Sequence, residues 1–204
     1  MPTLTVYGEA SDGFIDSDWS SYATARLGGG FKTAYPSGNS IVCGQSYWST
    51  PLYRCTELYI QYNTSAIPGA ATIIAVNEYL YVIGYGGSYT EEVRAYNWGA
   101  SLDTTDWISG ADLGGYTLLC SITSPAVSGY FAFPGNKDFI AYINTTGNTI
   151  IIHNSSKHRL GTAPTATEYT TYWSVDRSGT TQDPKITIDY SLATPIMTLN
   201  KGWW

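Results

Sequence analysis

The side chains with the clearest capacity for acid–base chemistry in this chain are aspartates in Gly- and Ser-rich segments. They are Asp16, Asp18, Asp103, Asp106 and Asp112. Glycosidic cleavage requires a pair of carboxyl groups, and their separation in space decides the role of each. Isolated aspartates in polar loops more commonly form Asx-turns. We therefore predict solvated loop residues, and we rank a glycan-cleaving enzyme as the last alternative.

Two histidines are the other candidates for catalysis. His153 and His158 stand five residues apart in "IIHNSSKHRL", so an extended chain would place them on opposite faces. The sequence contains no Gly-x-Ser-x-Gly motif for a nucleophile on a sharp turn. We predict that both are surface or turn residues and that the protein is not an enzyme.

The run "SDGFIDSDW" offers a candidate metal site. It places Asp12, Asp16 and Asp18 in one segment that we interpret as a loop. Calcium takes several oxygen ligands from carboxylates and carbonyls, although the spacing of an EF-hand is absent here. A structural calcium ion at these aspartates is the one cofactor that the sequence suggests.

Aromatic residues are unusually frequent, with 18 Tyr and 7 Trp. Five of them lie beside Gly, Ser and Thr in segments that we interpret as loops, and we predict that they contact a carbohydrate or a protein partner. These are Tyr47, Trp48, Tyr53, Tyr85 and Tyr89. Amphipathic rings of this kind stack on sugars, pack against a neighbouring subunit, or close the ends of the fold, and the sequence leaves all three open.

The segment "SLATPIMTLNKGWW" is mostly apolar, and Pro195 interrupts any strand there. Its apolar residues are Ile196, Met197, Leu199, Trp203 and Trp204. Burial of apolar surface contributes about 25 cal/mol per Å², so these side chains are expected to dock. We predict that residues 192–204 form an arm that contacts a neighbouring subunit of a homo-oligomer, with docking on the chain's own domain as the alternative.

Short alternating runs rich in β-branched and aromatic residues, separated by Gly, Pro, Asn and Ser, indicate roughly eight to ten strands. The segment Thr145–Thr149, "TTGNT", predicts a hairpin turn. The corner "NTSAIPGA" predicts a passage between sheets with Ile67 pointing inward. One short helical turn is expected between Ser101 and Leu113. The fold class predicted is all-β, a single-domain antiparallel, jelly-roll-like β-sandwich over residues 1–191 with an extended C-terminal tail.

Charge and cysteine content limit the classes of partner. The net charge of −6 and a pI near 4.7 argue against binding nucleic acid, which needs clustered Lys and Arg. No run approaches the ~20 apolar residues that insert into a membrane. Cys43 and Cys55 either bridge across a hairpin or stay buried free thiols like Cys120.

Three blocks of sequence resemble the DNRLRE-type β-sandwich modules, in the order that those modules have. The blocks are "SDGFIDSDWSSYATARLGGG", "ELYIQYNTSAIPGAATIIAVNEYLYV" and "YWSVDRSGTTQDPKITIDYS", and together they span about residues 11 to 191. In the middle block Ile67, Pro68, Ala71 and Ile73 fall in register with the family pattern. The pair Tyr62-Asn63 departs from it, because the family commonly has Phe-Asp there.

The resemblance implies a non-catalytic, jelly-roll-like module. Relatives of this kind include carbohydrate-binding modules of polysaccharide enzymes and stand-alone virion proteins of tailed phages. We expect no catalytic domain and no secretory signal in this protein, and therefore a virion structural protein, a capsid decoration or fibre component. It would be assembled in the host cytoplasm, sit on the virion surface, and contact capsid or other virion proteins and a surface glycan. The alternative is an extracellular carbohydrate-binding module.

Overall fold

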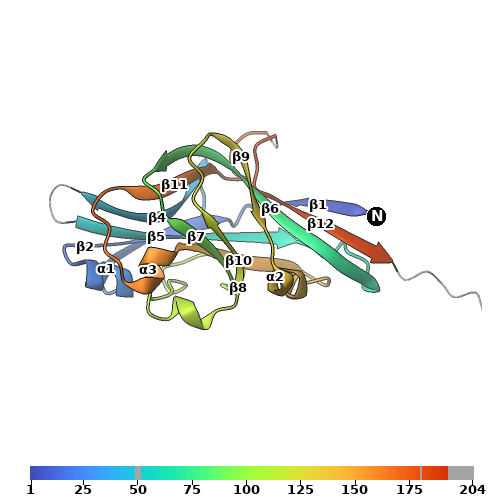
Figure 1. The fold of residues 1–204 in the computed structure, drawn as a ribbon, viewed down its shortest axis with the longest axis horizontal. Coiled ribbons are helices and arrows are strands. Elements are labelled where there is room, and N and C mark those ends of the chain that lie inside the picture. Colours follow the sequence, from blue (N-terminus) through green and yellow to red (C-terminus); the bar gives the residue numbers. More distant parts are fainter. Residues whose placement is uncertain (49–51, 180, 193–204) are drawn as a thin grey trace, which may run out of the picture.

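The computed structural model describes residues 1–48, 52–179 and 181–192, in which twelve strands form one antiparallel sheet that curls on itself (Figure 1). The strands are β1 (Thr3–Tyr7), β2 (Gly13–Trp19), β3 (Phe31–Tyr35), β4 (Ser40–Trp48), β5 (Leu52–Asn63), β6 (Ala71–Gly86), β7 (Thr90–Ala95), β8 (Leu118–Thr123), β9 (Gly129–Pro134), β10 (Asn148–Ser155), β11 (Glu168–Trp173) and β12 (Lys185–Leu192). The helices are α1 (Tyr22–Leu27), α2 (Lys137–Tyr142), α3 (Ser156–Leu160) and the 3₁₀ turn η1 (Leu113–Gly115).

The order of strands along the sheet is β1-β12-β6-β11-β4-β5-β10-β7-β8. Strand β2 pairs with both β3 and β5, and β9 pairs with β6. Every pairing is antiparallel. The prediction of an all-β antiparallel fold is therefore confirmed. The tail was predicted for residues 192–204; Leu192 ends β12, and residues 193–204 lie outside the described residues.

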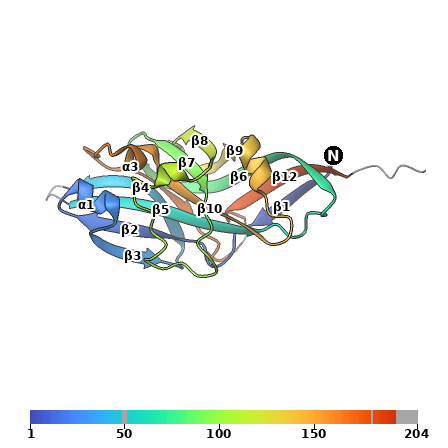
Figure 2. The same ribbon diagram turned by 90° about the horizontal axis from the view of Figure 1, so that it is seen from below.

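Two apolar cores lie on opposite faces of β5, which explains why this strand is buried on both sides. Leu58 and Ile60 enter the first core, which fills the inside of the curled sheet. Cys55 and Tyr59 enter the second core, which also contains Ala25 of α1. Figure 2 shows α1 and α3 close together at one end of the molecule. Period-2 alternation along one strand thus contributes to both cores.

The corner between β5 and β6 behaves as the sequence predicts. Strand β5 pairs with β2, β4 and β10, whereas β6 pairs with β9, β11 and β12. The chain therefore crosses between two parts of the curled sheet at this corner. Ile67 is only 2% exposed and belongs to the first core. An apolar residue in the polar corner plugs the crossing from inside.

The predicted hairpin at Thr145–Thr149 is wrong. This segment leads from α2 into β10, whose partners are β5 and β7. The apolar run before it forms a helix because Asn136 caps the first turn, accepting hydrogen bonds from the backbone N–H groups of Asp138 and Phe139. Phe139 of this helix is buried in the first core. The alternating pattern of the sequence did not predict the helices α1, α2 and α3.

The three cysteines are free and buried. Cys43 belongs to the first core and Cys55 to the second, on the other face of the sheet. Facing apart, these two thiols are not positioned to bridge. The alternative of buried thiols is the one that the structure supports. Among the described residues, no helix has the length and apolar character that crossing a bilayer requires.

Candidate functional site

A hollow of about 340 Å³ opens on one face of the sheet, over β3, β2, β5, β4 and β11. Its polar lining includes Asp16, Arg54 and Thr56, and its aromatic lining consists of Phe14, Tyr35 and Tyr169. The lining also contains Gln45, Ser46 and Thr171, so polar side chains converge beside aromatic rings, as they do in small-molecule sites. We take this hollow as the candidate functional site.

Strand register explains how residues distant in the sequence meet in the hollow. Asp16 of β2 pairs with Thr56 of β5, Thr56 pairs with Gly44 of β4, and Gly44 pairs with Tyr169 of β11. Cross-strand partners project to the same face, so these four positions form one row across the sheet. Gly44 carries no side chain, and the backbone of β11 approaches it so closely that an added Cβ would lie 2.6 Å from Cα of Tyr169.

The segment Gly13–Trp19 is a strand and not the loop that we predicted, so Asp16 and Asp18 project to the same face. Arg54 binds both carboxylates. Its Nε and Nη2 donate to the two oxygens of Asp18 at 2.8 and 2.7 Å, and its Nη1 lies 3.4 Å from Oδ2 of Asp16. This fork-like pairing is the strongest geometry for a guanidinium and a carboxylate.

Asp16 is the most perturbed of these groups. Burial raises the pKa of its carboxyl group to about 6, although Thr56 and Arg54 both act to lower it. The Thr56 hydroxyl donates to Oδ1 of Asp16 at 2.6 Å. Near neutral pH the group therefore changes between a charged acceptor and a neutral carboxylic acid that donates a hydrogen bond.

Aromatic rings form the sides of the hollow. Phe14 and Tyr35 stack with centroids 4.4 Å apart and planes inclined by 16°. Tyr169 stands beyond β5 and β4 and is 36% exposed. Three strand spacings of about 4.8 Å separate β2 from β11 in a flat sheet, roughly 14 Å in all. The polar side chains of Asp16 and Thr56 therefore lie between the stacked rings of Phe14 and Tyr35 on one side and Tyr169 on the other.

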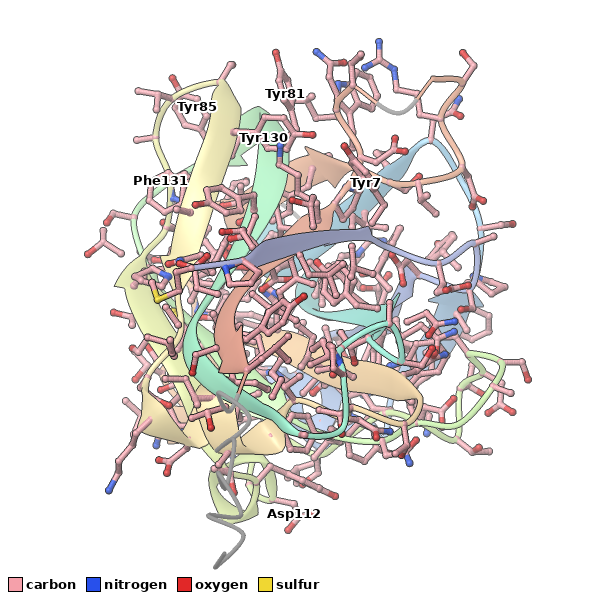
Figure 3. All side chains as sticks on the ribbon, turned by 90° about the vertical axis from the view of Figure 1, so that its right-hand side faces the viewer. Tyr7, Tyr81, Tyr85, Asp112, Tyr130 and Phe131 are labelled. Atoms are coloured by element: carbon pink, nitrogen blue, oxygen red, sulfur yellow. The ribbon has the colours of Figure 1, made fainter. Side chains whose placement is uncertain are left out.

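The aromatic residues that the sequence singled out are not the ones in this hollow. Tyr47 and Tyr53 contact each other at 5.0 Å between ring centroids, and Tyr53 packs against the second core, on the other face of the sheet. Trp48 ends β4, and its side chain lies outside the described part of the structure. Tyr85 lies on β6 and is 49% exposed, and Figure 3 shows it at the same margin of the molecule as Tyr81 and Tyr130.

Tyr89 requires a correction, because its side chain is only 3% exposed, belongs to the first core and does not line the hollow. Its hydroxyl donates to the backbone carbonyl of Cys43 at 2.9 Å and lies 3.0 Å from Oε2 of Glu91. The ring follows a Gly-Gly-Ser loop in the sequence, but a tyrosine with buried partners for its hydroxyl packs well in a core. The predicted contact residues of the tail, Ile196, Met197, Leu199, Trp203 and Trp204, fall in the part of the chain that the structure does not describe.

The other aspartates do not join Asp16. Asp103 accepts from the backbone N–H of Thr105 at 2.6 Å and donates its own N–H to Asp106 at 2.8 Å, as expected for Asx-turns. Asp112 bonds to Ser109 in the same segment, and Figure 3 shows it at the opposite margin from Tyr85. None of these loop aspartates therefore forms a carboxylate pair with Asp16.

The predicted calcium ligands already form hydrogen bonds and ion pairs with other residues of the protein. Asp12 is buried and accepts the backbone N–H of Gln61 at 2.8 Å, and burial raises its pKa well above the usual range. Asp16 and Asp18 are bound to Thr56 and Arg54. Within residues 1–48, 52–179 and 181–192, no group of three or more His, Cys, Asp or Glu side chains is arranged to hold a metal ion.

Both histidines are fully buried, so the prediction of surface or turn positions is wrong. His153 lies on β10 with its ring in the first core between two glutamates. His158 lies on α3, and its ring stacks obliquely on Trp107 at 5.3 Å. The apolar run "TIIIHNS" around His153 indicates a core position. The prediction used only the five-residue spacing of the two histidines and missed this signal.

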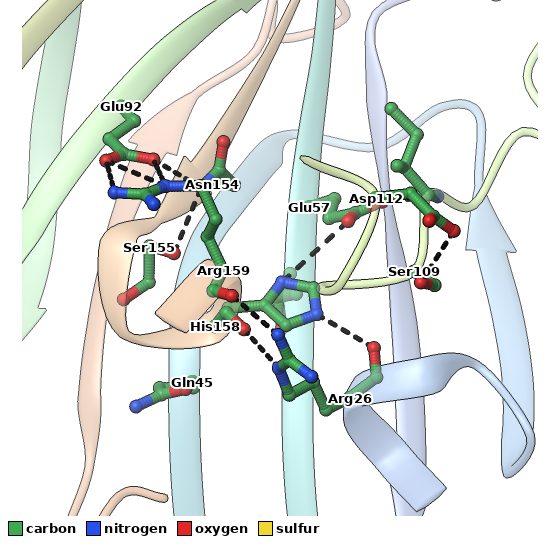
Figure 4. Close-up of polar contacts among 12 residues, drawn as sticks. Arg26, Gln45, Glu57, Glu92, Ser109, Asp112, Asn154, Ser155, His158 and Arg159 are labelled. Atoms are coloured by element: carbon green, nitrogen blue, oxygen red, sulfur yellow. Dashed lines mark hydrogen bonds and ion pairs between the residues drawn. The ribbon is translucent and has the colours of Figure 1, made fainter. Parts of the chain in front are cut away.

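Figure 4 shows that His158 joins α1, α3 and β5. The Nε and Nη2 atoms of Arg26 donate to the carbonyls of His158 and Arg159 at 2.7 and 2.5 Å, while Nε2 of His158 donates to the carbonyl of Arg26 at 3.1 Å. Nδ1 of His158 faces Glu57 at 3.7 Å. Burial lowers the pKa of His158 to about 4 and raises that of Glu57 to about 8, so both are neutral at pH 7. These contacts stabilise the fold and leave the hollow as the candidate site.

Compared with known proteins, the chain matches no family model and no curated protein at a significant level. The resemblance to DNRLRE-type modules remains a prediction from the sequence.

Proposed function

We propose that this protein binds a saccharide in the hollow and does not catalyse a reaction on it. The observation that carries the proposal is the row Asp16–Thr56–Gly44–Tyr169 beside the stacked pair of Phe14 and Tyr35. A sugar ring has an apolar face of C–H groups and a rim of hydroxyls. Aromatic sides and a polar floor match both features at once.

The polar groups are arranged for binding and not for proton transfer to a leaving group. Asp18 is held by two hydrogen bonds from Arg54, and Asp16 is held by Thr56 on one oxygen and faces Arg54 with the other. A glycosidase acid and its partner carboxylate must flank the scissile bond. Here both carboxylates approach the same guanidinium on one strand. This geometry favours a fixed recognition surface.

The test is a screen of immobilised oligosaccharides followed by calorimetry with the best ligand. Tyr35→Ala and Tyr169→Ala each remove a partly exposed ring from one side of the hollow. We expect each change to weaken binding about tenfold, which corresponds to about 1.4 kcal/mol. Tyr7→Ala is the matched control, because Tyr7 is similarly exposed and lies on β1, away from the hollow. Binding that is unaffected by both hollow variants would place the ligand elsewhere.

A location on a tailed-phage virion is a separate proposal that rests on the sequence resemblance alone. In that setting the saccharide would be a surface glycan and the other partners would be capsid or further virion proteins. Co-purification with particles at a stoichiometric copy number is the expected result. Glycan binding without particle association would favour the extracellular carbohydrate-binding module instead.

A further inference from the structure

We propose that Asp16 is the specificity-determining residue of the hollow and makes it select saccharides that carry no carboxylate or sulfate groups. This inference rests on the proposed function and specifies its ligand class. This selectivity follows from the charges that face the hollow, from the way Arg54 is bound, and from the hydrogen bonds that Asp16 can still accept.

The charged side chains in and beside the hollow are two carboxylates and one guanidinium. Asp16 and Asp18 come from β2 and Arg54 from β5, so the site carries one net negative charge when Asp16 is ionised. The lining side chains of β3 and β11 are Tyr35, Tyr169 and Thr171, all uncharged. An anionic ligand would meet like charge in a partly desolvated site, where repulsion is stronger than in water.

Glu168 is the nearest further carboxylate along β11, and a cation already balances it. Nζ of Lys157 lies 2.6 Å from its Oε1. The amide of Gln45 donates to Oε2 at 3.1 Å. Glu168 and Lys157 together leave the net charge at the hollow unchanged.

Arg54 is not available to an acidic sugar without a loss. Its Nε and Nη2 atoms form the two short hydrogen bonds to Asp18, and its Nη1 atom faces Asp16 at 3.4 Å, so the donors for a bidentate carboxylate or sulfate are already directed at carboxylates. An acidic ligand would have to displace Asp18 and leave that carboxylate without its partner. A hydroxyl group requires no such exchange.

Asp16 retains the capacity to accept hydroxyl donors. An ionised carboxylate offers about four lone-pair sites, and Asp16 uses one for Thr56 and one toward Arg54. Asp16 is only 3% exposed but lines the hollow, so we expect sugar hydroxyls to donate to the remaining sites, and burial strengthens such bonds. The aromatic sides then position the ring. Together these features favour a neutral saccharide.

The experiment compares the best neutral oligosaccharide from the screen with an acidic oligosaccharide of equal length and linkage; β-1,4-linked mannan and mannuronan oligomers are one such pair. Wild type is expected to bind the neutral series at least tenfold more tightly at pH 7.5. Asp16→Asn removes the negative charge and is expected to reduce this ratio several-fold. Asp18→Asn is the matched variant, since it releases the Arg54 fork and is expected to raise affinity for the acidic series. Thermal melts confirm that both variants fold.

A second readout is pH. Because burial raises the pKa of Asp16 to about 6, protonation at pH 5 should reduce the wild-type preference toward that of Asp16→Asn. Equal binding of both series by wild type, or a ratio that Asp16→Asn leaves unchanged, would overturn the inference while the proposed function stands. Binding of neither series would overturn the proposed function itself, and the inference with it.

Discussion

Nδ1 of His153 lies 2.9 Å from Oε1 of Glu91 in the first core, where neither side chain is exposed. On the other side of the ring, Nε2 lies 3.2 Å from Oε1 of Glu78. Burial alone would lower the pKa of His153, but the charges and hydrogen bonds of the two glutamates raise it to about 10. The hydroxyls of Tyr62 and Tyr172 donate to the same carboxylates at 2.8 and 2.7 Å. An imidazolium therefore links β10 to β6 and β7 inside the curled sheet.

Replacement of His153 by Leu should destabilise the protein strongly. The change leaves Glu78 and Glu91 buried without their cation, and breaking a buried ion pair in this way costs about 3–5 kcal/mol. Urea unfolding at pH 7 measures the difference. Ile151→Val, on the same strand and in the same core, is the control and should cost about 0.5–1.5 kcal/mol. Equal losses in the two variants would mean that the cation has no special role.

The same histidine predicts an alkaline loss of stability. Its pKa is higher in the folded state than in the unfolded chain, so the stabilisation is complete below about pH 6.5 and is lost as pH rises through about 10. The free energy of unfolding should therefore fall between pH 8 and 10 in wild type. In His153→Gln this slope should be smaller. Parallel curves for the two proteins over this range would contradict the assignment of charge to His153.

The sequence was sufficient for the fold class because long alternating strands such as β5, β6 and β12 carry a strong period-2 signal. It failed for β2, whose run "GFIDSDW" places three polar residues in seven and resembles a loop. Those polar residues are explained by their partners, since Asp16 meets Thr56 and Asp18 meets Arg54 across the strand pair. A local pattern does not contain this information.

The sequence did not predict the candidate site for the same reason. Its residues come from five strands, and Asp16 and Tyr169 are separated by 153 positions along the chain, counted from 16 to 169. Aromatic residues beside Gly and Ser indicated exposure for Tyr89, yet the structure buries it. Strand register decides which side chains become cross-strand neighbours, and it is set by tertiary pairing and by bulges. Composition showed that tyrosine is frequent without showing which rings share a face.

Glu57 gives a second pH effect, in a lower range. Its carboxyl group is buried, with Oε2 accepting from the Tyr59 hydroxyl at 2.6 Å and from the backbone N–H of Ile108 at 3.1 Å. Because burial raises its pKa to about 8, the folded state keeps a proton that the unfolded chain releases near pH 4.5. Unfolding free energy should fall as pH rises through this interval.

Glu57→Gln should remove that dependence. The amide oxygen replaces the accepting Oε2, and the amide nitrogen offers a donor to Nδ1 of His158, which has no hydrogen-bond partner among the described residues. We expect stabilities within about 1 kcal/mol at pH 5 and a more stable variant at pH 8.5, measured by denaturant unfolding. Glu57→Ala is the control and should lose stability at both pH values. A variant that is less stable than wild type at pH 8.5 would contradict the raised pKa of Glu57.

Gly44 affects both the stability of the fold and the shape of the hollow, because it pairs with Tyr169 across β4 and β11. Its φ of 136° is rare for residues with a side chain, and an added Cβ would collide with the carbonyl oxygen of Glu168 and lie 2.6 Å from Cα of Tyr169. Gly44→Ala should therefore push β11 away from β4 and destabilise the protein by about 1–3 kcal/mol. It should also weaken saccharide binding, because Tyr169 would leave the row opposite Asp16. Gly69→Ala is the control, since nothing lies within 4 Å of the added atom. Unfolding by urea and calorimetry on the folded variant measure the two effects, and a Gly44→Ala protein with normal stability and affinity would refute the close approach of these strands.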